Sequence, residues 1–134
     1  MQRILCLLTF LCAALLYLPL SSQAAETDSG RTLYLKYCSS CLGQDGKGNG
    51  PVSSVLKVKV PDLTMLKKNN KGVFPLARVI SSIDGSRVVR SHGDPTMPVW
   101  GEVFKEELKG EKYRELTTLL KTKVIAEYIA TFQR

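Results

Sequence analysis

The chain has 134 residues, of which 44% are hydrophobic and 23% are charged, and its formal net charge is +7. This composition is that of one ordinary globular domain, and it argues against a long disordered segment. No internal repeat is visible in the sequence, which excludes a repeat array as well.

The first 24 residues have the pattern of a secretory signal peptide. Arg3 supplies a positive charge, residues 4–20 form an almost unbroken apolar run, and Ser22 and Ala24 are small residues suited to a cleavage site. We therefore predict cleavage after Ala24 and a domain of residues 25–134 in the periplasm. The apolar run is long for a signal core, so an uncleaved membrane anchor is the alternative.

Cleavage would leave a basic domain. Its formal charge falls from +7 to +6, because Arg3 is the only charged residue lost with the signal. Five lysines then cluster in sequence: Lys57, Lys59, Lys67, Lys68 and Lys71. This lysine cluster favours docking on an acidic protein partner or weak association with an anionic membrane surface, and a solvated face is the alternative. Nucleic acid is not expected as a partner, because no aromatic residues interleave with the lysines.

Two amphipathic helices are predicted at the ends of this domain. The first runs from about Gly30 to Cys38, with Asp28 or Ser29 as its cap. The second carries apolar residues at intervals of three and four: Leu116, Leu119, Leu120, Val124, Tyr128, Ile129 and Phe132. Because Gly30 has no side chain, it would let the second helix approach closely. The two terminal helices are therefore predicted to pack together.

Shorter helices are predicted between the two terminal ones. One follows the segment 61–64 and runs to about Lys68. The next is opened by Pro75 and closed by Gly85. Its expected buried positions are Leu76, Val79, Ile80 and Ile83. Residues 86–101 have no clear period and are expected to be irregular.

Cys38 and Cys41 form a Cys-x-x-Cys pair, which is the most informative motif of the chain. Cys6 and Cys12 lie in the signal segment, so this pair supplies the two thiols of the mature domain. An apolar helical segment leads into the pair, and a glycine-rich loop follows it over residues 43–51. The thiols are therefore expected at a helix end, where cofactor or redox chemistry is accessible.

Four segments, in this order, resemble the class I c-type cytochromes of bacteria. They are Tyr34-x-x-x-Cys38-x-x-Cys41, Gly46-Lys-Gly-Asn-Gly-Pro51, Pro61-Asp-Leu63 and Met97-Pro-Val-Trp-Gly101. The similarity covers nearly all of residues 29–133. It implies an all-α fold whose terminal helices cross around a haem pocket, and electron transfer with redox protein partners. It also implies covalent haem c on Cys38 and Cys41, with Met97 as an iron ligand.

The sequence departs from this family at Leu42. The family signature is Cys-x-x-Cys-His, whose histidine ligates iron, whereas a leucine side chain has no lone pair to offer. His92 is the only histidine and lies five residues before Met97, so it is expected on the opposite face from Leu42, or at the pocket rim. Trp100 is expected to wall the pocket or to pack in the core.

The residues also support part of this interpretation by their chemistry. Two cysteines three positions apart at a helix end present both sulfur atoms to one edge of a flat ring. A thioether such as that of Met97 favours ferrous iron and so raises a haem's reduction potential. The structural alternative for Met97 is simple core packing.

Three functions from different classes fit the sequence. The first is a periplasmic electron carrier with one covalent haem, and the second is a haem-free domain of the same fold that binds a protein partner. The third is a Cys-x-x-Cys dithiol, which is disfavoured because a helix C-terminus opposes thiolate formation. Zinc and phosphate sites are weaker, since too few soft ligands and no phosphate-binding motif are present. No constellation of acid, base and nucleophile predicts an enzyme.

Overall fold

A computed structural model of the chain describes residues 22–87 and 98–134. In chain order the elements are α2 (Ser22–Tyr37), α3 (Ser39–Leu42), η1 (Ser53–Val55), η2 (Leu63–Met65), α4 (Leu66–Asn69), α5 (Leu76–Asp84), α6 (Trp100–Glu107) and α7 (Arg114–Thr131). The described residues contain no β-strand, so the predicted all-α class is confirmed. None of the described helices is both long enough and apolar enough to span a membrane.

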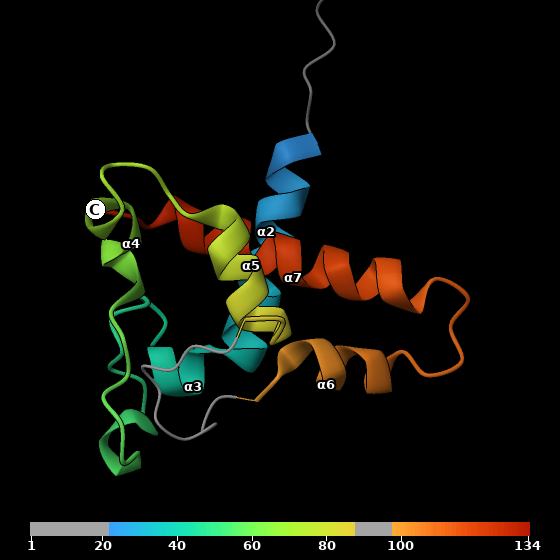
Figure 1. Ribbon diagram of the computed structural model, residues 1–134, viewed down its shortest axis with the longest axis horizontal. Helices are drawn as coiled ribbons and strands as arrows, with labels where there is room; N and C mark the ends of the chain where they lie inside the picture. Colours follow the sequence, from blue (N-terminus) through green and yellow to red (C-terminus); the bar gives the residue numbers. More distant parts are fainter. Residues whose placement is uncertain (1–21, 88–97) are drawn as a thin grey trace, which may run out of the picture.

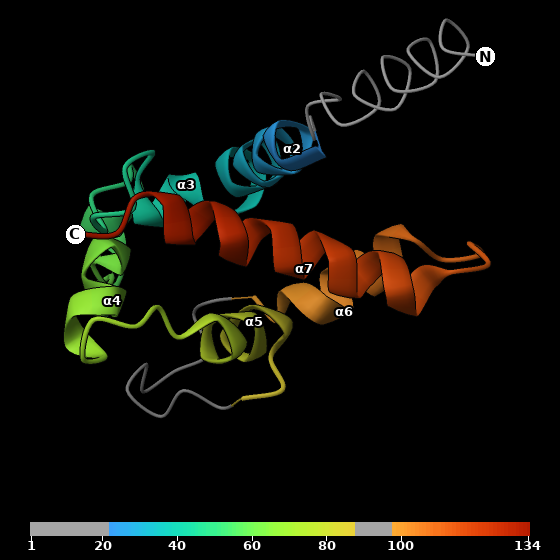
Figure 2. The same cartoon turned by 90° about the horizontal axis from the view of Figure 1, so that it is seen from above.

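The two longest helices, α2 and α7, cross each other (Figures 1 and 2) and form the centre of the core. Gly30 lies at the crossing, where a Cβ atom would overlap the carbonyl oxygen of Val124. One turn further on, Tyr34 is fully buried, and its ring centroid lies 5.4 Å from that of Tyr128 and 5.8 Å from that of Phe132. The prediction that the terminal helices pack together through Gly30 is therefore confirmed.

The first helix is longer than predicted. It begins at Ser22 and passes through Asp28 and Ser29, which were expected to cap it. Alanine, glutamine and glutamate precede these two residues and have high helix propensity, so the helix extends beyond the capping positions. A cap contributes only about 1 kcal/mol, which is too little to fix the start of a helix against favourable flanking residues.

The helix α7 turns a different face to the core in its first half than predicted. Leu116, Leu119 and Leu120 are 55%, 52% and 48% exposed, so their predicted burial is wrong. The residues that α7 buries are Thr118, Thr122, Ile125, Ala126 and Ile129. They recur at intervals of three and four and form one continuous stripe along the helix, against which α5 and α6 pack.

Of the two helices that pack against α7, the sequence predicts α5 but not α6. The helix α5 ends at Gly85, whose φ of 82° is left-handed, as the sequence predicts. Its Val79 and Ile83 are buried, whereas Leu76 in the first turn is 37% exposed. The helix α6 was not predicted, because its eight residues are too few to give a clear period. It lies alongside α7 (Figure 2) and buries Phe104 completely.

Candidate functional site

Cys38 lies at the junction between α2 and α3, and the helix does not simply end there. The Cys38 N–H donates to the Tyr34 carbonyl oxygen at 2.9 Å, and the Leu42 N–H donates to the Cys38 carbonyl oxygen at 3.0 Å. Cys38 itself has φ −116° and ψ −33°, which is still right-handed helical backbone, and it is the one residue between the two helices. The prediction of a helix end at Cys38 is therefore right for α2, but the chain makes one further helical turn, α3, that carries Cys41.

The two thiols have different surroundings. Cys38 is 6% exposed and belongs to the hydrophobic core, whereas Cys41 is half-buried, and both are free in the structure. Burial, and to a lesser extent the neighbouring Cys41, raise the pKa of the Cys38 thiol to about 12. Cys38 is therefore a neutral thiol at pH 7 and a poor nucleophile, which weighs against a reactive dithiol.

The loop after the cysteines is held against α3 by backbone hydrogen bonds. The Gly48 N–H donates to the Leu42 carbonyl oxygen at 2.8 Å, and the Gly50 N–H donates to the Cys41 carbonyl oxygen at 3.1 Å. A Cβ atom on Gly50 would overlap the carbonyl oxygen of Ser40, so glycine is needed for this close approach. The loop therefore fixes the backbone of the Cys-x-x-Cys turn from one side.

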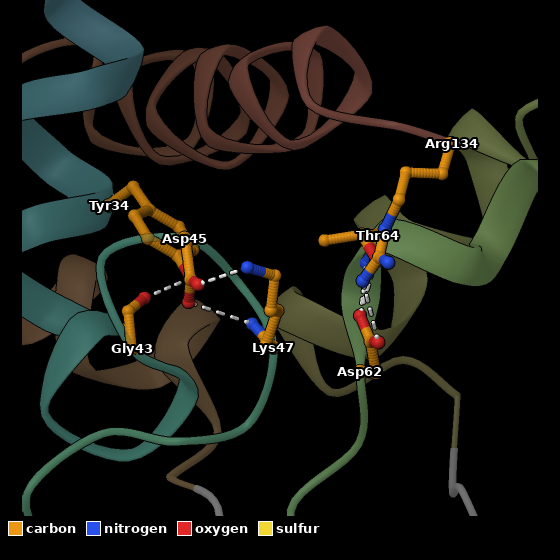
Figure 3. A network of polar contacts seen from close by, with 7 residues as sticks. All are labelled: Tyr34, Gly43, Asp45, Lys47, Asp62, Thr64 and Arg134. Atoms are coloured by element: carbon orange, nitrogen blue, oxygen red, sulfur yellow. Dashed lines mark hydrogen bonds and ion pairs between the residues drawn. The ribbon is translucent and has the colours of Figure 1, made fainter.

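The same loop is attached to the core through Tyr34. The Tyr34 hydroxyl group donates to the Gly43 carbonyl oxygen at 2.7 Å (Figure 3), and this bond is buried. Burial raises the pKa of Tyr34 well above its usual value, so the hydroxyl group stays protonated and keeps donating. The sequence shows Tyr34 four residues before Cys38, but it does not show that the hydroxyl group reaches across to the loop.

The C-terminus closes the far side of the loop (Figure 3). The Leu63 N–H donates to the Gly46 carbonyl oxygen at 2.7 Å, which joins the loop to the next segment. Arg134 then binds that segment, since its Nε donates to the Thr64 hydroxyl oxygen at 2.9 Å and its guanidinium lies 3.3 Å from Asp62. Hydrogen bonds thus connect the end of α7 to the glycine-rich loop, and sequence analysis missed this arrangement.

Aromatic rings bring the start of α6 to the cysteine end of α2. The ring centroid of Tyr37 lies 5.2 Å from that of Trp100 and 5.1 Å from that of Phe104. The Tyr37 hydroxyl group also donates to the Glu107 carboxylate at 2.9 Å. Tyr37 directly precedes Cys38, so these contacts place Trp100 beside the Cys-x-x-Cys end of the helix. Trp100 is half-buried and packs against the hydrophobic core, so the predicted core packing is observed.

The described residues on either side of 88–97 contact each other. A Cβ atom on Gly85 would overlap the Val99 side chain, and one on Gly101 would overlap the Asp84 carbonyl oxygen. The chain therefore leaves α5 and enters α6 at neighbouring points. Met97 and His92 lie outside the described residues, so their expected positions stay predictions.

Leu42 is the last residue of α3, is half-buried and packs against the core. Its side chain offers no donor atom for a metal ion. Within residues 22–87 and 98–134, no group of three or more His, Cys, Asp or Glu side chains could hold a metal. The Leu42 position therefore does not fit the iron ligand that the family resemblance implies.

A second feature borders the site without belonging to the expected haem pocket. An open cleft of about 480 Å³ is lined by Ser39, Ser40, Gly43, Gln44, Asp45, Asn49, Gly50 and Pro51. Neither cysteine lines it, and its walls are small or polar residues. In the same region, the Lys47 side chain lies 2.8 Å from the Asp45 carboxylate and lowers the pKa of that group.

The predicted lysine cluster lies on the outside of the molecule. Lys57, Lys59, Lys67, Lys68 and Lys71 are all exposed, and none of them forms an ion pair with a described residue. The α6–α7 region differs, because its lysines pair with glutamates, as in Lys105–Glu115 and Lys121–Glu107. Uncompensated positive charge is therefore concentrated on the segments between α3 and α5.

The sequence and the structure were compared with protein-family models, curated proteins and solved structures. None of these comparisons finds a match. The assignment of function therefore depends on the residues and on the geometry described above.

Proposed function

We propose that this chain is a periplasmic electron-transfer protein with the class I cytochrome c fold, and that it carries one covalent haem on Cys38 and Cys41. The observation that carries the proposal is the contact between Tyr37 and Trp100. It joins the residue before Cys38 to the residue three positions after Met97. Two motifs more than fifty residues apart in the sequence therefore converge, as a shared cofactor would require.

The chemistry of attachment suits these two thiols. Each thiol adds across one vinyl group of the haem: the sulfur bonds to one carbon, the proton goes to the other, and no electron is gained or lost. A buried neutral thiol such as that of Cys38 is protected from competing oxidation, which begins from the thiolate. A covalent link would also keep the cofactor on the protein outside the cytoplasm.

Partners and location follow from the same proposal. The predicted signal segment exports the chain, and residues 25–134 form the mature electron carrier. The unpaired lysine cluster is the surface for an acidic redox partner, with weak association with an anionic membrane as the alternative. No catalytic reaction is proposed, because the residues suggest no acid, base and nucleophile in one place.

The proposal is tested by restoring the family's histidine. The chain, with its signal, is expressed alongside a c-type maturation system, and the native sequence is compared with Leu42→His by intact mass and by Soret absorption. Leu42→His should gain one haem and a low-spin spectrum that depends on Met97. A matched control, Leu42→His with Cys38→Ser and Cys41→Ser, should gain no covalent haem. A folded Leu42→His variant that takes up no haem would rule out the cytochrome assignment.

A haem-free binding module is the second candidate, and Leu42 is the observation that favours it. Leu42 supplies no nitrogen ligand to iron, so the protein would bind a haem more weakly than a chain with histidine at this position. In that case the lysine cluster alone would carry function. The native chain would then remain haem-free in the maturation experiment, while Leu42→His would still load.

A further inference from the structure

The first half of α7 carries an apolar face that no other described element covers. Leu116, Leu119 and Leu120 are each about half exposed, and Tyr113, directly before the helix, is more exposed still. Single exposed apolar side chains are ordinary on a protein surface, but several large ones side by side on one helix form a patch. We call these four residues the leucine face.

The leucine face continues the row of side chains through which α7 packs on α2. Val124 and Tyr128 lie beside Gly30 of α2. Leu120 and Leu116 precede them at intervals of four residues, which places all four on one side of the helix. The helix α2 covers the second half of this row and crosses away from the first half (Figure 1). The first half is therefore a packing surface for which the described part of the chain supplies no partner.

The charges around the leucine face are balanced, unlike those of the lysine cluster. Lys105 pairs with Glu115 at 3.6 Å, and Lys123 pairs with Glu127 at 2.7 Å. An acidic protein or an anionic membrane would be drawn to the lysine cluster instead, which α4 and the segment before it carry at the opposite end of the molecule (Figures 1 and 2). An apolar centre rimmed by both signs of charge suits a partner with the same pattern.

The leucine face also has the shape to receive a copy of itself. An open hollow of about 400 Å³ is lined by residues 110–116, at the start of the face, while Leu119 and Leu120 lie about one turn further along α7. In a contact with two-fold symmetry, a feature of one copy meets a second feature of the other copy, and the reverse contact forms at the same time. An antiparallel pair of α7 helices would place the leucines of each copy over the hollow of the other.

We propose that the chain forms a symmetric dimer in which the leucine faces of two copies pack antiparallel to each other. The arrangement brings Glu111, on the rim of one hollow, toward Lys123 of the other copy, one turn beyond Leu119. It also keeps the two lysine clusters far apart, because each lies at the opposite end of its own copy (Figure 1). The dimer does not depend on haem, and it leaves both lysine clusters accessible to the proposed acidic partner.

Sedimentation equilibrium of the exported protein over a wide range of concentrations tests the dimer. A reducing agent is present, so that a disulfide through the half-buried Cys41 cannot link two copies. The leucine face is small for an interface, so the average mass should rise from that of one chain toward twice that value and should fall again on dilution. A mass that stays that of one chain at every concentration overturns the inference.

Two variants with the same change of charge show whether the leucine face makes the contact. Leu119→Glu would bury a carboxylate in the contact from each copy, so it should weaken association by about tenfold or more. Val73→Glu, at an exposed apolar position outside the face, should associate like the native chain. Circular dichroism checks the fold, and Leu116→Gln is a second variant with the same expected loss. Equal association of Leu119→Glu and Val73→Glu overturns the inference.

Charge reversal tests the antiparallel arrangement. Glu111→Lys places like charges together in both symmetric pairs and should weaken association by about fivefold, the scale of two exposed ion pairs. Adding Lys123→Glu to that variant restores opposite charges and should recover most of the loss. A double variant that associates no better than Glu111→Lys shows that the arrangement is wrong.

Membrane binding is the competing use of the leucine face. Vesicles of phosphatidylcholine and phosphatidylglycerol are mixed with the native chain, Leu119→Glu and Val73→Glu, and bound protein is measured by flotation. All three should bind equally, because the leucine face is not expected to contact lipid. Loss of vesicle binding in Leu119→Glu alone, without a change in sedimentation, assigns the face to a membrane and overturns the dimer.

Discussion

The two halves of α7 have similar sequence patterns but different surroundings. In the second half, Val124 and Tyr128 meet Gly30 and Tyr34 of α2, while Ile125 is completely buried. In the first half, α2 has crossed away (Figure 1). There the leucines are exposed to solvent, and Thr118 and Thr122 are buried. An apolar pattern shows that a helix has a buried face, but the partners decide which face that is.

The largest expected effect compares one residue from each half. Ile125→Ala removes a fully buried side chain and should destabilise the fold by about 3 kcal/mol, the usual cost of a large cavity in a core. Leu119→Ala, the matched change in the first half, should cost less than about 0.5 kcal/mol, because Leu119 is 52% exposed. Urea unfolding followed by circular dichroism measures both values. Equal losses would show that the leucine face is buried in solution.

The sequence predicts the crossing better than the ends of the elements. Gly30 and Tyr34 share a helix face, and that spacing is sufficient to predict close packing against Tyr128. The start of α2 and the existence of α6 depend on small energy differences, because caps and short helices contribute little alone. The segment of α6 packs against Tyr37 and α7, and we infer that these contacts stabilise it as a helix.

The candidate site was also predicted in part. Cys38 and Cys41 were identified from their spacing and Leu42 from the family resemblance, and the structure places all three on one short helical turn. The burial of Cys38 and the bond from Tyr34 to Gly43 could not be predicted, because they depend on how the loop folds back. Long-range contacts of this kind have no local sequence signal, apart from the glycines that permit them.

The next prediction concerns the crossing itself. Gly30→Ala should destabilise the protein by about 2 kcal/mol, since the new methyl group would meet the Val124 backbone, which cannot rotate away. The change acts against helix propensity, which favours alanine over glycine by about 1 kcal/mol. Thr32→Ala, an exposed position on the same helix, is the control and should be neutral or slightly stabilising. A Gly30→Ala protein as stable as this control would mean that the helices do not touch there.

The smallest expected change in stability concerns the two buried threonines in the first half of α7, Thr118 and Thr122. The Thr118 hydroxyl oxygen is buried and has no hydrogen-bond partner among the described residues, whereas the Thr122 hydroxyl group donates to the Thr118 carbonyl oxygen at 3.0 Å. Thr118→Val keeps the shape and removes an unsatisfied polar group, so it should stabilise the fold by about 1 kcal/mol.

Thr122→Val is the matched control for Thr118→Val. It removes a hydroxyl group that is already bonded, so its effect should be close to zero or slightly destabilising. Thermal unfolding of the two variants, at one pH and one protein concentration, distinguishes these cases. If Thr118→Val is instead the less stable of the two, the Thr118 hydroxyl group has a partner in solution. The threonine stripe would then be held by polar contacts, and the two halves of α7 would be stabilised by different kinds of interaction.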